Sequence, residues 1–249
     1  MIIKLKKRPG KKLFLLSSLI LLAVTLPGCL TGTVIKSFMW PEPDTKGAGR
    51  PIIACVGDSI TYGYGVLGHR EDAWPALLPA LADGRCTTVN YGLCNRTLLS
   101  TSGMPYSKEK NARIFMEEDE DLVLLMLGTN DSKPSNWDAE LFEKEYIELV
   151  ERILAKPCRP KVVLMLPPCL FNTTGKALPD RDNLENGVIP AIRRVAEKTG
   201  LPVIDLFELT KNRPDWFPDG IHPNREGNMA IAGRVALEIS SFSYPDRPL

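Results

Sequence analysis

Residues 52–60 read IIACVGDSI. The first five are apolar and mostly β-branched, which is typical of a strand buried on both faces of a parallel sheet. The run stops at Gly57, and Asp58 and Ser59 follow at once. In open α/β sheets, ligands and reactive groups gather at the carboxyl ends of the strands. Ser59 is therefore a candidate nucleophile, provided that the chain also supplies a base, an orienting acid and an oxyanion hole.

Further strands and helices alternate along the chain. The expected strands are 86–90, 121–127, 161–166 and 202–206, and the expected helices are 73–82, 138–155, 184–199 and 225–239. Strands that are apolar on both faces and alternate with helices favour a mostly parallel sheet with helices on both sides. The expected fold class is α/β, a three-layer α/β/α sandwich around five strands.

Small and polar residues follow two of these strands. Gly92 comes after the strand at 86–90, and residues 128–131 read GTND after the strand at 121–127. The carboxyl ends of parallel strands lie at one edge of a sheet. We therefore expect both segments to lie close to Ser59.

A loop before the last helix carries a carboxylate and a histidine. Residues 217–224 read FPDGIHPN, so Asp219 and His222 are three positions apart. In a turn, this spacing lets the carboxylate meet one ring nitrogen while the other nitrogen faces outward. A histidine held in this way can take the proton of a serine. Taken alone, the loop favours a solvated or capping histidine.

Four segments in a fixed order carry a resemblance to a known family. They are GDSI at 57–60, NYG at 90–92, GTND at 128–131 and DGIHPN at 219–224. Together they resemble the SGNH (GDSL) hydrolases, and the resemblance covers residues 51–239. It implies a flavodoxin-like sheet of the SGNH hydrolase fold.

The resemblance also implies roles for individual residues. Ser59 would be the nucleophile, His222 the base and Asp219 the residue that orients it. The N–H groups of Ser59 and Gly92 and the side-chain amide of Asn130 would form the oxyanion hole. The chain departs from the family pattern at 95–96, where many members have glycine or a small residue and this one has Asn-Arg.

The activity implied is that of a serine esterase acting through a Ser-His-Asp triad and an acyl-enzyme. The segment after GTND, up to Trp137, and the segment 189–205 resemble carbohydrate acetylesterases, including sialate O-acetylesterases. We therefore expect hydrolysis of small acyl esters, above all O-acetyl groups on carbohydrate. Two alternatives stay open: a GDSL lipase of the lysophospholipase or acyl-thioesterase type, and an inactive glycan-binding surface lipoprotein.

Two tryptophans lie beside the motifs. Trp137 follows the GTND segment and Trp216 precedes the DGIHPN segment. Either ring could stack on a sugar, and either could pack its loop against the core. The sequence does not choose between these interpretations.

Composition argues against several kinds of partner. The chain has two histidines, His69 and His222, and its six cysteines lack metal-ligand spacing, so we expect no metal and no cofactor. Five cysteines follow Cys29, and this odd number predicts at least one free thiol. Beyond residue 28, the sequence has no basic patch of the kind used for nucleic-acid binding.

The first 28 residues are expected to be a lipoprotein signal peptide. Six basic residues between positions 4 and 12 precede an apolar stretch, Leu13 to Leu26, and then Cys29. A stretch of 14 residues is short for a bilayer span, which needs about 20, and is typical of a signal sequence. The order resembles a bacterial lipobox with Cys29 as the lipidated residue. An ordinary signal peptide or an uncleaved anchor are the alternatives.

Residues 29–49 would then be a lipidated tether, and residues 50–249 the hydrolase domain. Cleavage would remove six positive charges, so the net charge would move from +1 to about −5. The protein would be attached by lipid to a membrane of the bacterial cell envelope, without spanning it.

Overall fold

The computed structural model describes residues 50–242. The expected signal peptide (1–28), the lipidation site Cys29 and the tether (29–49) lie outside the described residues. Within residues 50–242, no helix is both long enough and apolar enough to cross a membrane.

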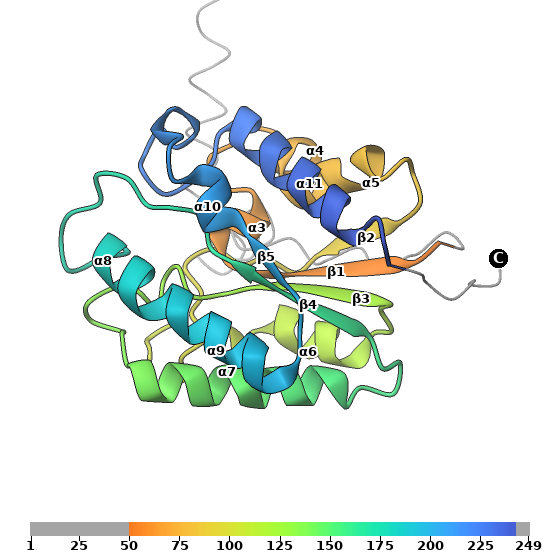
Figure 1. Cartoon of the computed structure of the whole chain (residues 1–249), viewed down its shortest axis with the longest axis horizontal. Coiled ribbons are helices and arrows are strands. Elements are labelled where there is room, and N and C mark those ends of the chain that lie inside the picture. Colours follow the sequence, from red (N-terminus) through yellow and green to blue (C-terminus); the bar gives the residue numbers. More distant parts are fainter. Residues whose placement is uncertain (1–49, 243–249) are drawn as a thin grey trace, which may run out of the picture. The chain divides into compact units, whose positions relative to one another are not determined.

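Five parallel strands form the central sheet (Figure 1). They are β1 (Ile52–Gly57), β2 (Thr87–Asn90), β3 (Leu122–Met126), β4 (Lys161–Leu166) and β5 (Val203–Asp205). Their order is β2-β1-β3-β4-β5, and every neighbouring pair is parallel. This is the flavodoxin-like arrangement, so the expected fold class is confirmed, and each strand lies where the sequence predicted it to within a residue or two.

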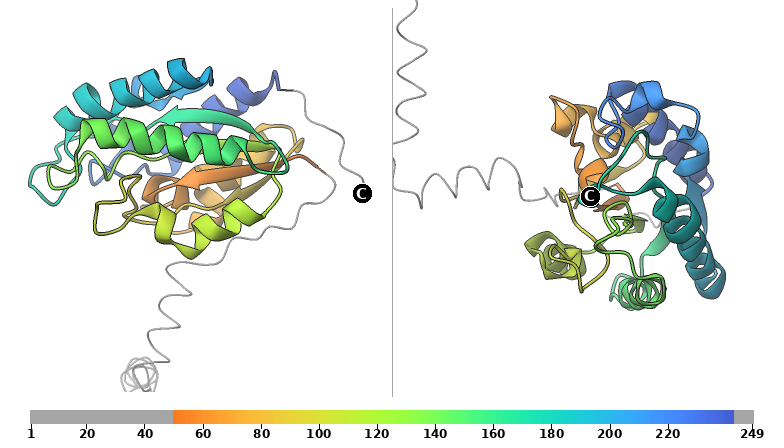
Figure 2. Two further views of the ribbon diagram at one scale, coloured as in Figure 1. Left: turned by 90° about the horizontal axis from the view of Figure 1, so that it is seen from below. Right: turned by 90° about the vertical axis from the view of Figure 1, so that its left-hand side faces the viewer.

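Helices cover both faces of the sheet. On one face lie α5 (Trp74–Leu81) and α11 (Arg225–Ile239), and on the other lie α6 (Lys110–Glu117), α7 (Ala139–Leu154) and α9 (Ile189–Thr199) (Figures 1 and 2). The shorter helices are α3 (Ser59–Tyr62), α4 (His69–Asp72), α8 (Arg181–Asn183), α10 (Leu206–Thr210), the 3-10 turns Tyr106–Lys108 and Pro214–Trp216, and the π-helical turn Leu184–Val188. The helix expected at 184–199 thus begins with a π-helical turn, and α6 was not expected.

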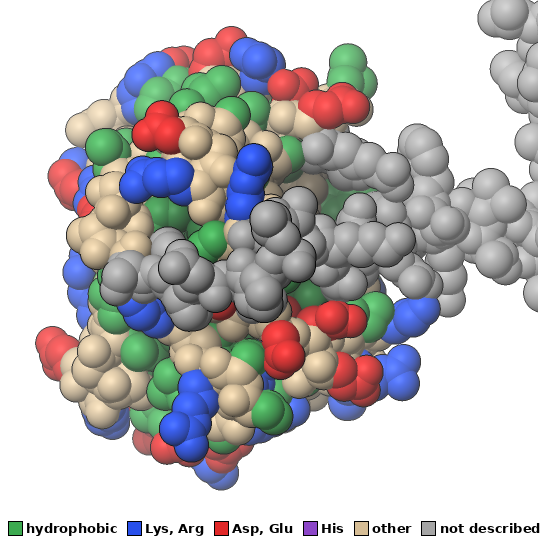
Figure 3. Space-filling model, turned by 90° about the vertical axis from the view of Figure 1, so that its right-hand side faces the viewer, with side chains coloured by type: hydrophobic (Ala, Val, Ile, Leu, Met, Phe, Trp, Pro, Cys, Tyr) green, Lys and Arg blue, Asp and Glu red, His purple; other side chains and the backbone are tan. Residues whose placement is uncertain are grey.

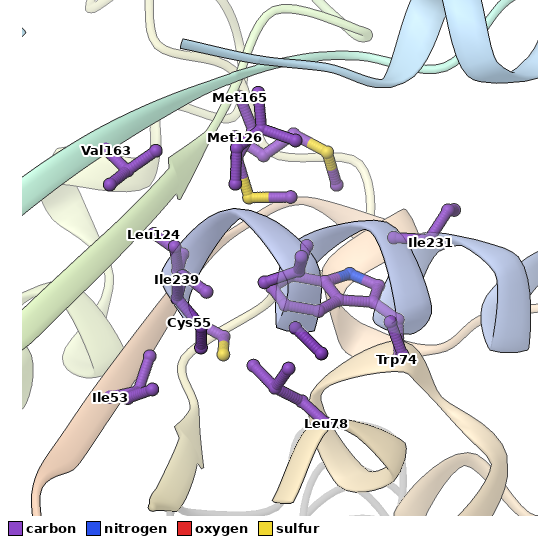
Figure 4. Packing of buried hydrophobic residues seen from close by; sticks show 14 of the residues in the cluster. Ile53, Cys55, Trp74, Leu78, Leu124, Met126, Val163, Met165, Ile231 and Ile239 are labelled. Atoms are coloured by element: carbon purple, nitrogen blue, oxygen red, sulfur yellow. The ribbon is translucent and has the colours of Figure 1, made fainter. Parts of the chain in front are cut away.

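The core explains why the strands are continuously apolar. Successive side chains of a strand point to opposite faces, and both faces of this sheet are covered. Ile53 and Cys55 of β1 pack with Leu124 of β3 against Trp74 and Leu78 of α5 (Figure 4). The intervening β1 residues are buried as well. Fully burying one such side chain contributes about 1.5–3 kcal/mol to folding.

The carboxyl end of β1 is a point of close approach. Gly57 is in register with Met126 of β3, and α3 starts two residues later. A Cβ atom on Gly57 would lie 2.2 Å from Thr61 Oγ1 and 2.7 Å from the carbonyl oxygen of Met126. A glycine therefore lets the first turn of α3 fold back directly onto the strand end, where the strand order reverses between β1 and β3.

The five cysteines that the structure describes are all free thiols. The prediction of at least one free thiol, made from their odd number, is therefore confirmed.

Figure 3 views the molecule from the right-hand side of Figure 1. On that face acidic and basic side chains are interspersed, without an extended patch of either sign.

Candidate active site

The nucleophile candidate sits at the start of α3. Asp58 caps this helix, because its Oδ1 accepts a hydrogen bond of 2.9 Å from the N–H of Ile60. Asp58 is fully buried, and burial raises the pKa of its carboxyl to about 6. The cap fixes the turn, and the turn presents Ser59 at the carboxyl edge of the sheet beside β3.

Ser59 meets a histidine from the other end of the chain. The Oγ of Ser59 lies 2.9 Å from Nε2 of His222, and Nδ1 of His222 lies 2.6 Å from Oδ2 of Asp219. An ionised carboxylate can only accept, so Nδ1 carries the ring proton and Nε2 accepts from the serine. The structure therefore brings Ser59, His222 and Asp219 into one hydrogen-bonded chain.

Asp219 is held in its ionised form. Its Oδ1 accepts the N–H of Ile221 at 2.9 Å and that of His222 at 2.7 Å. Burial opposes ionisation, but these bonds and the one from the His222 ring outweigh it and hold the pKa of Asp219 below its usual value. The ring of Tyr64 lies 4.5 Å from the ring of His222 and packs against it. The imidazole is thus oriented on two sides.

Asn130 reaches the same place from β3. It is buried, and one hydrogen of its Nδ2 is donated to the carbonyl oxygen of Arg96 at 3.1 Å. The backbone carbonyl oxygen of Asn130 accepts a hydrogen bond of 2.9 Å from Nδ2 of Asn136. An amide nitrogen has two hydrogens, so the second remains for a substrate oxygen.

The expectation for Gly92 needs correction. Its N–H donates to Oδ1 of Asn90 at 2.9 Å, and it does not line the cavity beside Ser59. A Cβ at this position would lie 2.3 Å from the backbone nitrogen of Tyr62 and 2.7 Å from the carbonyl carbon of Thr61. Gly92 is therefore a glycine because β2 ends against α3, and the structure does not place its N–H in an oxyanion hole.

Asn95 lies three residues further along the chain, at the cavity. It lines the cavity with Ser59 and Asn130, and its φ is +64°. Asparagine is among the few residues other than glycine that adopt this left-handed conformation readily. Within residues 50–242, its N–H has no hydrogen-bond partner. The sequence signal was present, since an asparagine stands where many family members have glycine or a small residue.

Asp131 ties this loop to the end of β3. Its carboxylate is fully buried and accepts the N–H of Leu98 at 3.0 Å and that of Leu99 at 2.8 Å. Burial is the main cause that raises the pKa of Asp131 to about 7. The carboxyl thus anchors the loop that carries Asn95 and the Arg96 carbonyl.

A cavity of about 370 Å³ opens over these groups, a size within the range of small-molecule sites. Its lining consists of Ser59, Tyr64, Cys94, Asn95, Asn130, Lys133, Ala177, Leu178, Pro179, Asp219, Ile221 and His222. The wall at 177–179 belongs to the loop between β4 and α8, which the sequence did not single out.

Neither tryptophan faces this cavity. The Trp137 ring packs on Gly187, where a Cβ would lie 2.5 Å from its Cζ2, and on the ring of Phe142 at 5.3 Å. The guanidinium of Arg213 lies 3.7 Å above the ring of Trp216. The packing interpretation therefore holds for both. The aromatic side chain that does line the cavity is Tyr64, which is half exposed.

A serine, a histidine and a carboxylate joined at the carboxyl edge of a parallel sheet define a hydrolase site of the nucleophilic type. Residues 55–230 match the model of the GDSL-like lipase/acylhydrolase family, and the chain belongs to this family.

Relatives and solved structures agree with this assignment. An acetylxylan esterase of Xylanibacter ruminicola is 30% identical over 231 residues, which are 84% of this chain and 46% of the relative, so the chain spans about half of that protein. The thioesterase 1/protease 1/lysophospholipase L1 of Escherichia coli is 22% identical over 81% of this chain and 89% of its own length.

Two crystal structures share the fold. Est24, a carbohydrate acetylesterase from Sinorhizobium meliloti, superposes with a TM-score of 0.65 at 19% identity, covering 77% of this chain and 99% of that one. The M. smegmatis aryl esterase gives a TM-score of 0.67 at 20% identity, covering 78% of this chain and 100% of that one.

Replacing Asp131 with Asn tests the anchoring of the loop. The variant loses one of two carboxylate acceptors, and a buried N–H left unpaired costs about 1–3 kcal/mol. The folded pKa of about 7 exceeds the value of about 3.9 for an unfolded Asp. The folded state therefore binds more protons than the unfolded state between about pH 4 and 7, and stability falls as pH rises through this window.

The measurement is the free energy of unfolding in urea for both proteins from pH 4 to pH 8. The stability of the wild type relative to Asp131→Asn should be greatest at pH 4 and should decline by up to about 4 kcal/mol toward pH 8. Titrations common to both proteins cancel in this difference. A difference that does not vary with pH would contradict the assigned pKa.

Proposed function

We propose that this protein is a serine esterase that removes O-acetyl groups from carbohydrate. The observation that carries the proposal is the chain from Ser59 Oγ through His222 to Asp219, with distances of 2.9 and 2.6 Å, at the floor of a cavity. Family membership supports ester hydrolysis. The names of the acetylxylan esterase relative and of the carbohydrate acetylesterase neighbour support an acetylated sugar as substrate.

The first step is attack by Ser59 Oγ on the acetyl carbonyl. Nε2 of His222 takes the serine proton, and the ionised Asp219 stabilises the resulting imidazolium. The imidazolium then gives its proton to the sugar oxygen as the C–O bond breaks, which leaves an acetyl-enzyme. A water molecule, deprotonated by His222, releases acetate and restores Ser59.

The oxyanion that forms in both steps needs preorganised donors. We assign this role to the N–H of Ser59, to Nδ2 of Asn130 and, in place of Gly92, to the N–H of Asn95. All three residues line the cavity. The hydrogen bond from Asn130 to the Arg96 carbonyl keeps the amide from rotating. The departure from the family pattern at Asn95 thus leaves the number of donors unchanged.

Replacing Asn130 with Ala should remove one oxyanion donor. Loss of such a donor costs about 3–4 kcal/mol of barrier, so kcat should fall by roughly two to three orders of magnitude with less change in KM. Steady-state hydrolysis of p-nitrophenyl acetate measures this. Asn186→Ala is the matched control, since Asn186 is exposed and bonds Asp182 away from the cavity. A fall of less than tenfold for Asn130→Ala would remove Asn130 from the oxyanion hole.

Rates of hydrolysis on a panel of esters distinguish the acetylesterase from the lysophospholipase or thioesterase alternative. The name of the E. coli relative supports that alternative. Acetylated xylo-oligosaccharides and p-nitrophenyl acetate should be hydrolysed faster than p-nitrophenyl octanoate, because the names of the acetylxylan esterase relative and of the carbohydrate acetylesterase neighbour support a small acyl group. A marked preference for octanoyl or longer esters would favour the alternative.

Ser59→Ala should abolish both hydrolysis and labelling by a serine-directed fluorophosphonate. A wild-type protein that neither hydrolyses esters nor takes up the label would contradict the esterase proposal and favour the inactive glycan-binding alternative. Labelling that persists in Ser59→Ala would exclude Ser59 as the nucleophile.

The proposed location is the bacterial cell envelope, with lipid on Cys29. The sequence order of basic segment, apolar stretch and cysteine supports it. Two acyl chains would hold the domain at a membrane surface. Palmitate fed to expressing cells should be incorporated into the wild-type protein and not into Cys29→Ser. Equal incorporation in both proteins would show that Cys29 is not the lipidation site.

A further inference from the structure

One charged side chain of the cavity has no part in the proposed chemistry. Lys133 follows the GTND segment in the turn between β3 and α7, is partly buried, and lines the cavity with Ser59 and Asn130. Its Nζ donates to Oδ1 of Asn95 at 2.5 Å. An ammonium group has three hydrogens, so this bond leaves two for another acceptor.

The charge of Lys133 is not matched by an ion pair. Among residues 50–242, no carboxylate forms a salt bridge with its Nζ. Arg96, which follows Asn95 in the sequence, differs in this respect, because it forms a salt bridge of 2.9 Å with Glu109. Lys133 is partly buried, and the reduced hydration of its ammonium lowers its pKa.

The carboxylates around Lys133 balance its charge only in part. Asp219 lines the cavity, but its oxygens are engaged by Ile221 and by the backbone and ring of His222. The charges of Asp58 and Asp131 oppose the lowering of the Lys133 pKa by burial, and both residues are fully buried and outside the cavity lining. Burial raises the pKa of Asp58 to about 6 and of Asp131 to about 7. Both therefore hold a proton part of the time near neutrality.

We propose that Lys133 binds an anionic group of the substrate, so that the preferred substrates are acetyl esters of acidic, carboxylate-bearing sugars. The inference rests on the proposed function and narrows its substrate class. With the acetyl carbonyl at Ser59, the two remaining hydrogens of Lys133 meet the sugar carboxylate. A charge-assisted hydrogen bond in a partly dehydrated site is about twice as strong as a neutral one, so Lys133 selects among sugars.

The test compares acidic and neutral acetyl esters on the full-length protein. The acidic probes are a mono-O-acetylated methyl glucuronoside and O-acetylated N-acetylneuraminic acid, and the neutral probe is the matching mono-O-acetylated methyl glucoside. The readout is the ratio of kcat/KM for acidic over neutral probes. This ratio should exceed one in the wild type for at least one acidic probe, and it should fall as salt is raised.

Lys133→Met removes the charge at nearly constant length and should lower the ratio by about tenfold or more. Lys133→Arg keeps the charge and should retain most of the ratio. Lys144→Met is the control, because Lys144 lies exposed on α7, outside the cavity, in a 3.9 Å pair with Glu148, and such pairs contribute little. Its ratio should equal that of the wild type.

Two results would overturn the inference. One is a wild-type ratio of one or less for both acidic probes. The other is a Lys133→Met variant in which acidic and neutral rates fall equally, which would show that Lys133 acts only by positioning Asn95. Neither result touches the proposed function, whose failure would appear separately as absent hydrolysis of p-nitrophenyl acetate by the wild type.

Discussion

The parallel pairing of β1 with β3 is the constraint on which the site depends. Gly57 is paired with Met126, so the two strands end at the same level. Ser59 follows one strand end and Asn130 follows the other, and the strand order reverses between them. The reversal leaves a crevice that no crossover helix fills, and His222 enters it from the loop before α11. A change in register by one residue would separate the nucleophile from the amide.

A second constraint is the buried carboxylate of Asp131. It holds two N–H groups of the loop at 98–99, while Asn130 beside it holds the carbonyl of Arg96. The loop and the end of β3 are therefore joined by three hydrogen bonds within two residues of sequence. This explains how a non-glycine residue with positive φ can stand at position 95, since the energetic cost of that conformation is offset by the bonds around it.

The same linkage connects catalysis with selectivity. Asn95 lines the cavity, and its side-chain Oδ1 accepts a hydrogen bond from Lys133. Lys133 in turn lines the cavity and is within the electrostatic influence of the buried carboxylates of Asp58 and Asp131. The ammonium group of Lys133, which is proposed to select the substrate, is thus hydrogen-bonded to the side chain of Asn95, whose N–H is a proposed oxyanion donor. A replacement of Lys133 can alter either catalysis or substrate selectivity. The ratio of kcat/KM for acidic over neutral esters separates the two effects, because a change in catalysis alone lowers both rates equally.

The sequence by itself determined the strands, the alternation of strands and helices along the chain, and the three residues Ser59, His222 and Asp219 that form the hydrogen-bonded triad. These follow from the continuous apolar runs that two covered faces require and from motifs in family order. Only the tertiary structure decided which residues and which aromatic rings line the cavity. Gly92 packs against α3 and donates its N–H to Asn90, whereas Asn95 lines the cavity. The rings of Trp137 and Trp216 pack against other side chains, and Tyr64 lines the cavity. Such outcomes depend on contacts between segments distant in sequence, which no local pattern records.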